Sequence, residues 1–447
     1  MVIQPNDTVP SDSLETNNPR FQFSKGGEDL FAKAPDAEFN WQKCAIETRE
    51  HLRDAMNARN LSFLLGSGCS SLVRSGEEFG IPTMAPLAKE FLNSPNPSAP
   101  TIYLTDDDVE SLLSMLGINI KGKEFENNLE RLMEVLFSAK FLLEKSSNLS
   151  FADCKTRIDS LISRVVQFIY NKCNTAQAEP EKSPVVSLYQ TFYRRLTFRE
   201  RTLPRPWVFT TNYDLFNEIA LDRLGIPYCN GFSGSVERRF NPSSYRYALA
   251  EQLDITSRRW TSVDGYLYLC KLHGSINWIE DGHGLFPIRE VPAASKAASR
   301  AMIYPTPAKQ NASFGSPYSD LFREFQSQIV REQSVLVLLG YSFGDEHVNN
   351  IIYQALTIPS FRMIAFVNPN IGGVVERLRS LRDPRIWLIG GKGADSTSNA
   401  HYFDCFVENF MPAPPGNKVE TAVEWVLKEL LGRSSADPQT ESSNEER

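Results

Sequence analysis

Short apolar runs recur along the chain, and most of them end in a glycine or a polar turn. The runs lie at 62–65, 207–210, 266–269, 335–339, 363–367 and 386–389. Helical patterns follow several of them, at 214–224, 346–357 and 373–381. Buried strands that alternate with helices predict an α/β fold with a Rossmann-like parallel sheet. Ligands of such sheets bind outside the carboxyl ends of the strands, where the polar turns fall.

The region 106–200 has a different pattern, because its apolar residues follow helical spacing. Examples are Leu129, Leu132, Leu136 and Leu143, and then Ile158, Leu161, Val165 and Ile169. This pattern predicts a large all-helical insertion between two strands of the sheet. The insertion ends in a basic run formed by Arg194, Arg195, Arg199, Arg201 and Arg205. Such a run is either a solvated helix face or a surface that docks an anion or an acidic partner.

Both ends of the chain are polar. The polar composition predicts that residues 1–38 form a flexible N-terminal arm and that residues 434–447 form a disordered tail. Neither segment has enough apolar side chains to form a core. Between them, residues 39–433 predict one folded domain that contains the insertion.

Composition narrows the class of protein. The 447 residues are 41% hydrophobic and 23% charged, as in ordinary globular domains. The net charge of −7 argues against a general nucleic-acid surface, so we do not expect direct nucleic-acid binding. The seven cysteines are scattered and form no CxxC pair, which argues against disulfides and a cysteine-ligated zinc. We find no signal peptide or membrane segment and expect a cytoplasmic protein.

A glycine-rich turn, Gly66-Ser67-Gly68-Cys69-Ser70, follows the first apolar run. Small residues allow backbone N–H groups to approach a phosphate, and a following helix would add its dipole. The third glycine of the dinucleotide fingerprint is absent, because Ser71 stands in its place. A plain strand-to-helix turn is therefore the alternative interpretation.

Two further turns carry side chains suited to chemistry. In Thr210-Thr211-Asn212-Tyr213-Asp214, the amide of Asn212 can bind a ribose hydroxyl or a water, while Asp214 can cap a helix or orient Asn212. In Leu272-His273-Gly274-Ser275, the position of His273 directly after an apolar strand suits a general base that faces a cleft. A structural histidine is the alternative.

The most apolar run leads into Gly340-Tyr341-Ser342-Phe343-Gly344-Asp345-Glu346-His347. The glycines and the serine suit contacts to phosphate or ribose. Asp345, Glu346 and His347 fit the start of a helix better than a metal site, since one histidine joins two adjacent carboxylates. We therefore expect no metal.

Taken together and in this order, the motifs resemble the sirtuin superfamily, and specifically its prokaryotic sirtuin-like NAD-hydrolase branch. The resemblance is carried by GSGCS (66–70), TTNYD (210–214), LHGSINW (272–278), GYSFGDEHVNNII (340–352) and VNPN (367–370). It implies that NAD is the substrate, with Asn212 and His273 as catalytic residues at the nicotinamide ribose. The other residues that it implies to bind NAD are Gly66, Ser67, Gly68, Thr211, Asp214, Gly340, Ser342 and Asn368. Among these, the glycine turn is placed near the pyrophosphate, Ser342 near the nicotinamide-side ribose or phosphates, and Asn368 near the adenosine ribose.

The resemblance also implies a biological role. The chain is similar to antiphage effectors that deplete NAD by splitting it into nicotinamide and ADP-ribose. Some of these effectors act with a HerA-type ATPase. We therefore expect a homo-oligomer whose trigger arrives from a partner, with the arm 1–38 and the helical block 106–200 as candidate gates. A NAD-dependent protein deacylase or ADP-ribosyltransferase is an alternative, although the deacylases' paired zinc cysteines are missing after His273. A non-catalytic NAD or ADP-ribose sensor is a second alternative.

Overall fold

The structure is a computed structural model of the chain. It describes residues 20–32, 40–74, 76–93, 104–146, 152–200, 202–254, 259–280, 288–292, 300–302, 317–395 and 398–412. The predicted tail at 434–447 and residues 1–19 of the predicted arm lie outside these ranges.

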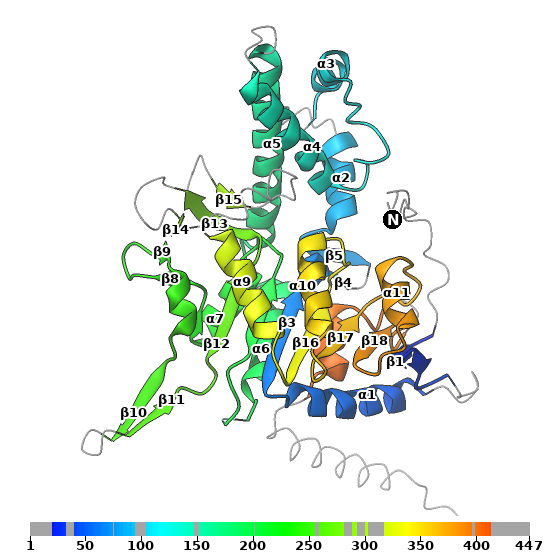
Figure 1. Ribbon diagram of the computed structural model, residues 1–447, viewed down its shortest axis with the longest axis vertical. Coiled ribbons are helices and arrows are strands. Elements are labelled where there is room, and N and C mark those ends of the chain that lie inside the picture. The colour runs from blue at the N-terminus through cyan, green and yellow to red at the C-terminus, as the bar shows by residue number, and fades with distance from the viewer. Residues whose placement is uncertain are drawn as a thin grey trace, which may run out of the picture.

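A nine-stranded sheet forms the centre of the molecule, in the order β2-β1-β18-β17-β16-β3-β6-β12-β7 (Figure 1). All pairs from β18 to β7 are parallel. The strands span β1 (Gln22–Lys25), β2 (Glu28–Asp29), β3 (Asn60–Leu65), β6 (Trp207–Thr210), β7 (Tyr228–Cys229), β12 (Leu267–Lys271), β16 (Ser334–Leu339), β17 (Arg362–Phe366) and β18 (Ile386–Gly390). Each of the six apolar runs therefore forms a parallel strand, which confirms the predicted Rossmann-like α/β fold.

The order of the strands reverses between β3 and β16. From β3 the chain adds β6 and β12 on one side, and it later adds β16, β17 and β18 on the other. Leu65 pairs with Thr210 on one side and with Leu339 on the other, so the three strands end level with one another. A reversal of this kind opens a crevice at the carboxyl edge, where ligands of open α/β sheets bind.

Helices cover both faces of this sheet, because successive strand residues point to opposite sides. Phe63 and Leu65 belong to one hydrophobic core and Leu64 to the other. The first core is completed by α1 (Trp41–Met56), α6 (Pro184–Thr197), α7 (Phe216–Leu224), α12 (Phe403–Cys405) and the π-helical turn η5 (Phe406–Phe410). The second is completed by α9 (Tyr318–Ile329), α10 (Glu346–Leu356) and α11 (Val374–Ser380).

The predicted helical insertion is confirmed and rises beyond the carboxyl edge of the sheet (Figure 1). It contains α3 (Asp106–Leu116), α4 (Leu129–Lys145) and α5 (Ala152–Ala176), and α2 (Met84–Asn93), which precedes the predicted boundary, packs with it. By contrast, α6 returns to the sheet, where Phe192 meets Phe63 at a ring distance of 5.2 Å. Local signals start these helices, since Thr105 and Asp108 form a reciprocal capping box before α3.

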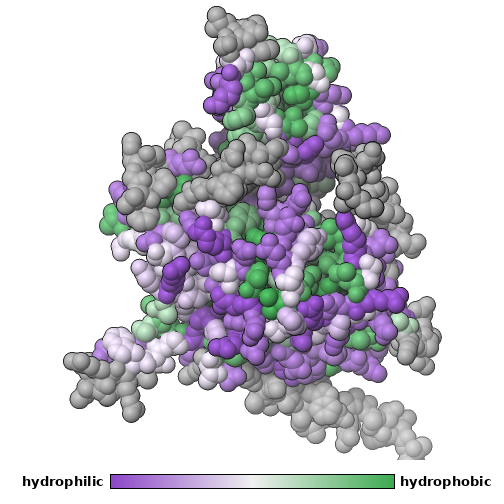
Figure 2. Space-filling model, in the orientation of Figure 1, coloured by the Kyte–Doolittle hydropathy of each residue, from purple (hydrophilic) through white to green (hydrophobic). Residues whose placement is uncertain are grey.

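The outer end of this projection is partly apolar. Figure 2 shows apolar residues gathered near its tip, and Leu113, Phe141 and Leu142 are exposed there. In the described ranges, no helix combines the length and the apolar character that a membrane span requires.

The prediction of a flexible arm over 1–38 is wrong for residues 20–32. Strand β1 pairs antiparallel with β18, with Phe23 opposite Ile389, and β2 pairs with β1. Phe21 and Phe23 are fully buried. The three-residue alternation Phe-Gln-Phe was enough to place one face of this segment in the core, although the residues around it are polar.

A second, antiparallel sheet lies beside the first and was not predicted. Its strands run in the order β15-β13-β14-β9-β8, and a separate hairpin joins β10 to β11. The bounds are β8 (Phe232–Ser233), β9 (Arg239–Phe240), β10 (Ala250–Asp254), β11 (Arg259–Ser262), β13 (Gly274–Glu280), β14 (Ile288–Glu290) and β15 (Arg300–Met302). Most of these strands are too short to show an alternating pattern, so tertiary pairing rather than local sequence defines them.

Two arginines of the basic run after the insertion form hydrogen bonds within the fold. Arg195 donates to the backbone carbonyls of Val407 and Met411. Arg199 donates to the carbonyls of Met56, Ala58 and Arg59, and burial lowers its pKa to about 10. These two side chains therefore hold α6 and the residues after it to η5 and to the end of α1, and the expectation of a docking surface is not supported for them.

Candidate active site at the carboxyl edge of the sheet

Two glycine turns pack backbone against backbone at the crevice. A Cβ on Gly66 would lie 2.3 Å from the carbonyl oxygen of Gly340, and Gly340 itself has a φ of +59°. The N–H of Gly68 donates to that same carbonyl at 3.1 Å. Glycine is needed at these positions because no side chain fits between the turns.

The expected helix after the glycine turn is absent. The turn continues as a short 3-10 segment, η2 (Ser67–Cys69), and then as the hairpin β4 (Ser71–Arg74) and β5 (Glu77–Gly80). The loop therefore presents no helix dipole to a phosphate. The N–H of Gly66 is also engaged, since it donates to the carbonyl of Leu339 at 2.9 Å.

A cavity of about 160 Å³ lies between these turns and the helical block. Seven of the predicted site residues line it: Ser67, Thr211, Asn212, Asp214, His273, Gly340 and Ser342. The opposite wall comes from α2, α4 and α5, through Met84, Leu87, Leu129, Glu130, Ile169 and Cys173. The fold thus brings together turns that lie up to 275 positions apart in the chain, from Ser67 to Ser342.

Asn212 is held rigidly at this cavity. Its amide nitrogen donates to the carbonyl of Gly66 at 2.9 Å and to the Ser70 hydroxyl at 2.8 Å. Ser70 in turn donates to Asp214 Oδ2 at 2.7 Å, and Asp214 Oδ1 accepts from the N–H of Phe216 at 3.1 Å. Asp214 therefore orients Asn212 through Ser70, and it also accepts the first N–H of α7, although the N-cap position itself is occupied by Leu215. Both N–H groups of the amide are occupied, which leaves its oxygen to accept a hydrogen bond from a ligand.

His273 is paired with a carboxylate that the sequence assigned only to a helix cap. Its Nε2 lies 2.7 Å from Asp345 Oδ2, and both side chains are largely buried. The other oxygen of Asp345 caps α10 by accepting from the N–H groups of His347 and Val348, as predicted.

The charge state of this pair follows from its surroundings. Burial opposes the ionisation of Asp345, but the hydrogen bond and charge of His273 and the N–H of Val348 outweigh it and lower the pKa of Asp345 to about 2. An ionised carboxylate only accepts hydrogen bonds, so we assign the proton to Nε2 of His273. Nδ1 is then the basic nitrogen of the ring.

Comparison with known protein families gives a match in this part of the chain. The SIR2-like domain family matches residues 206–379, which include the turns that carry Asn212, His273 and Asp345. The match supports a sirtuin-like superfamily member. SIR2-like domains use NAD, so the match points to an NAD-utilising enzyme. A search of curated proteins gave no match to the chain.

A buried lysine that was not among the predicted site residues supports the turn that carries Asn212. Lys271 Nζ donates to the carbonyls of Tyr213 and Asp214 and to the Ser275 hydroxyl, and it lies 3.1 Å from Glu218 Oε1. It thereby fixes the backbone of the turn that carries Asn212. A single charged residue at the end of an apolar strand was the available signal, because a lysine is almost never fully buried without partners.

Asn349 has a similar role in the turn that carries Ser342. Its amide donates to the carbonyl of Phe343 at 2.7 Å and accepts from the Tyr341 hydroxyl at 2.9 Å. Phe343 has a φ of +59°, a conformation that is strained for a bulky residue. The network around Asn349 holds this conformation and keeps Ser342 at the cavity.

Three predicted residues do not line the cavity. Gly66 and Gly68 lie behind it in the packed turns described above. Asn368 follows β17 at the same edge of the sheet, where its Oδ1 accepts from the N–H of Asn370 at 3.0 Å. Its contact with an adenosine ribose stays a prediction.

The residues fit one end of NAD better than the whole molecule. The cavity holds an amide oxygen, a histidine and small hydroxyl groups, which suit a ribose. Its volume of about 160 Å³ is below the roughly 300–1,000 Å³ of most ligand sites. In the described part of the chain, no group of three or more histidine, cysteine or acidic side chains is arranged to hold a metal ion.

Proposed function

We propose that this protein hydrolyses NAD at the bond between nicotinamide and ribose. The observation that carries the proposal is the His273–Asp345 pair, which borders the same cavity as the fixed amide of Asn212. This arrangement combines a base, a carboxylate that orients it and a hydrogen-bond acceptor for a sugar hydroxyl. Such a set serves water attack at a ribose carbon.

The reaction balances without a further reagent. The oxygen of water forms a bond to the ribose carbon, and the carbon–nitrogen bond breaks with its electron pair moving to the nicotinamide nitrogen. The products are nicotinamide, ADP-ribose and one proton, which reaches solvent after a base has accepted it.

Each residue has a role in this scheme. The oxygen of Asn212 accepts a hydrogen bond from a ribose hydroxyl or from the attacking water. Nδ1 of His273 accepts the proton, and Asp345 stabilises the resulting imidazolium through Nε2. Ser342 and Ser67 provide hydroxyl groups for ribose or phosphate oxygens at the rim.

We further propose that the activity depletes NAD as an antiphage defence and is gated. A hydrolase that was always active would exhaust its own cell. The apolar side chains of Leu87, Leu129 and Ile169 line the cavity opposite the turns, and its volume of about 160 Å³ is small for a whole dinucleotide. Movement of the helical block is therefore the proposed gate. A homo-oligomer and a HerA-type ATPase partner are the proposed sources of that movement.

Incubation of the pure protein with NAD tests the proposed chemistry. Chromatography should detect nicotinamide and free ADP-ribose in equal amounts. Substitution of His273 by alanine should lower the rate by about 10²–10⁴-fold, the usual contribution of a general base, with NAD binding retained. His51 lies on α1, away from the cavity, and its alanine variant is the matched control.

Other outcomes would support another function. Consumption of NAD only with an acylated peptide or a protein acceptor would indicate a deacylase or an ADP-ribosyltransferase. Binding of NAD without turnover, with and without a partner, would indicate a sensor.

A further inference from the structure

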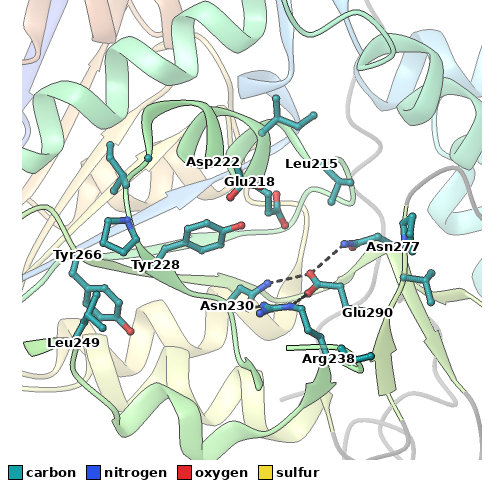
Figure 3. Close-up of a pocket in the computed structure, with 17 residues that line it drawn as sticks. Leu215, Glu218, Asp222, Tyr228, Asn230, Arg238, Leu249, Tyr266, Asn277 and Glu290 are labelled. Atoms are coloured by element: carbon teal, nitrogen blue, oxygen red, sulfur yellow. Dashed lines mark hydrogen bonds and ion pairs between the residues drawn. The ribbon is translucent and has the colours of Figure 1, made fainter. Parts of the chain in front are cut away.

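A second cavity of about 1000 Å³ lies on the other side of α7 and shares no lining residue with the candidate active site. Figure 3 shows its walls, which come from α7, from the loop around β7 and from β13 and β14. Nothing in the proposed NAD chemistry uses this space. Its charged lining side chains are three carboxylates, Glu218, Asp222 and Glu290, and one cation, Arg238.

One of the carboxylates in the cavity is already neutralised. Glu290 accepts from Arg238 at 2.5 Å, from Asn230 at 3.1 Å and from Asn277 at 3.2 Å. Figure 3 shows these four side chains gathered at one side of the cavity. They form a floor of fixed shape whose charges cancel.

Two buried acceptor atoms at the cavity, one of them on Asn277 of this floor, have no donor among the described residues. The Glu218 side chain is 9% exposed, and its Oε1 pairs with Lys271, but its Oε2 has no hydrogen-bond partner among the described residues. Asn277 Oδ1 is likewise buried and unpaired within the described ranges. Figure 3 shows the Glu218 carboxylate directed toward the space between Tyr228 and Asn277. Buried acceptors of this kind favour a ligand that brings N–H or O–H donors.

The other side chains that line the cavity indicate which class of donor fits it. Asp222 lies exposed at the cavity and adds a carboxylate to Glu218 and Glu290, against the two cations Arg238 and Lys271. The site therefore has one negative charge in excess. The rings of Tyr228 and Tyr266 and the side chain of Leu249 complete an aromatic and apolar wall. Carboxylates beside aromatic rings are the usual surroundings of an organic cation.

We propose that this cavity binds an organic cation, a primary ammonium or guanidinium group carried on an apolar body. Asp222 neutralises the charge, Glu218 and Asn277 accept its N–H groups, and the apolar body packs on Tyr228 and Leu249. The same chemistry is found in free amines and in lysine or arginine side chains of a peptide.

Titration calorimetry of the full chain tests this proposal with probes of each source. The free probes are benzylammonium and agmatine, with neutral benzyl alcohol for comparison, and the peptide probes are capped tripeptides with a central lysine or arginine. At least one cationic probe should bind, and benzyl alcohol should bind at least tenfold more weakly than benzylammonium. A preference for tripeptides would identify a basic protein segment as the natural ligand, and a preference for free amines a small molecule.

The variants must leave the candidate active site intact. Glu218 is unsuitable because its partner Lys271 also holds the turn of Asn212. Asp222→Asn removes the exposed carboxylate with little change in shape and should weaken cation binding at least tenfold. Asp54→Asn, an exposed carboxylate on α1, is the matched control and should leave it unchanged. Tyr228→Leu should also weaken binding, which provides a second variant that keeps the charge.

The proposal fails if no cationic probe binds at millimolar concentration, or if Asp222→Asn and Tyr228→Leu both bind like the Asp54→Asn control. NAD hydrolysis is measured separately, so failure here leaves the proposed function standing.

Discussion

At the scale of single residues, the candidate site is a set of side chains held by other side chains. Asn212 is oriented by Ser70, which is oriented by Asp214. His273 is oriented by Asp345. Arrangements of this kind cost little to reorganise during a reaction, because the groups are in place before the substrate arrives.

Substitution of Asp345 by asparagine should separate its two roles. Asparagine caps a helix about as well as aspartate, so the free energy of unfolding should fall by about 1–3 kcal/mol, from loss of the buried hydrogen bond to His273 alone. The imidazolium of His273 loses its carboxylate partner, so NAD turnover should fall by about 10²–10⁴-fold. Turnover that matches the native protein would leave Asp345 with a capping role alone.

Substitution of Asn212 by alanine should remove most NAD turnover. It deletes the acceptor oxygen and two buried hydrogen bonds, so the free energy of unfolding should also fall by about 1–3 kcal/mol. Denaturant unfolding and initial rates measure the two effects. Ser70→Ala is the control, because it loosens the amide but keeps its oxygen and should retain more activity. Equal losses in both variants would show that Asn212 acts only as a structural residue.

At the scale of elements, segments distant in the sequence complete the site and the sheet. The helical block supplies one wall of the cavity, and the turns after β3, β6, β12 and β16 supply the other. Strand β1 closes the sheet beside β18 and buries two phenylalanines. Residues 20–32 are thus part of the folded domain.

Substitution of Phe23 by alanine should therefore destabilise the whole domain. The ring is fully buried and contacts Phe31, His51 and Trp387, so the expected cost is about 3–5 kcal/mol. Chemical denaturation measures this loss. Leu30→Ala, at a position in the same segment that is 44% exposed, is the matched control and should cost much less. An unchanged midpoint for Phe23→Ala would contradict the packing of this segment in solution.

At the scale of the whole molecule, the small cavity is lined on one side by the turns at the sheet edge and on the other by α2, α4 and α5. This arrangement fits the proposed hydrolase in a form that is closed at rest, with the helical block as the proposed gate. A partner that binds the projection would then act on the site by shifting the equilibrium between closed and open forms.

The purified chain alone should be a weak NAD hydrolase, and a partner should raise its rate. We compare the full chain, a version without residues 1–19, and the full chain mixed with the product of the neighbouring gene. Removal of residues 1–38 is unsuitable, because it would delete β1 and β2. Light scattering alongside the rates measures whether the active form is an oligomer. High and equal turnover in all three samples would contradict gating by a partner.

The local pattern of apolar and polar residues predicted much of this architecture. Six apolar runs predicted six parallel strands, and the polar turns after them predicted a site at one edge, because burial imposes its period on consecutive residues. The helical insertion was predicted for the same reason, since its buried residues follow helical spacing. Short motifs also identified Asn212 and His273, since rare side chains after buried strands stand out in a single sequence.

Other features depend on which segments meet in space. Local pattern assigned Asp345 to a helix cap and could not show that it also reaches His273, 72 positions away. The sequence shows that Lys271 lies at the end of an apolar strand. It does not show that the partners of Lys271 lie on α7 and on the turn after β6. Gly66 and Gly340 look like phosphate-binding glycines, yet their close contact with each other is what requires them. Hydrophobic periodicity reports the burial of each residue, whereas these pairings follow from the order of strands in the sheet, which no single segment encodes.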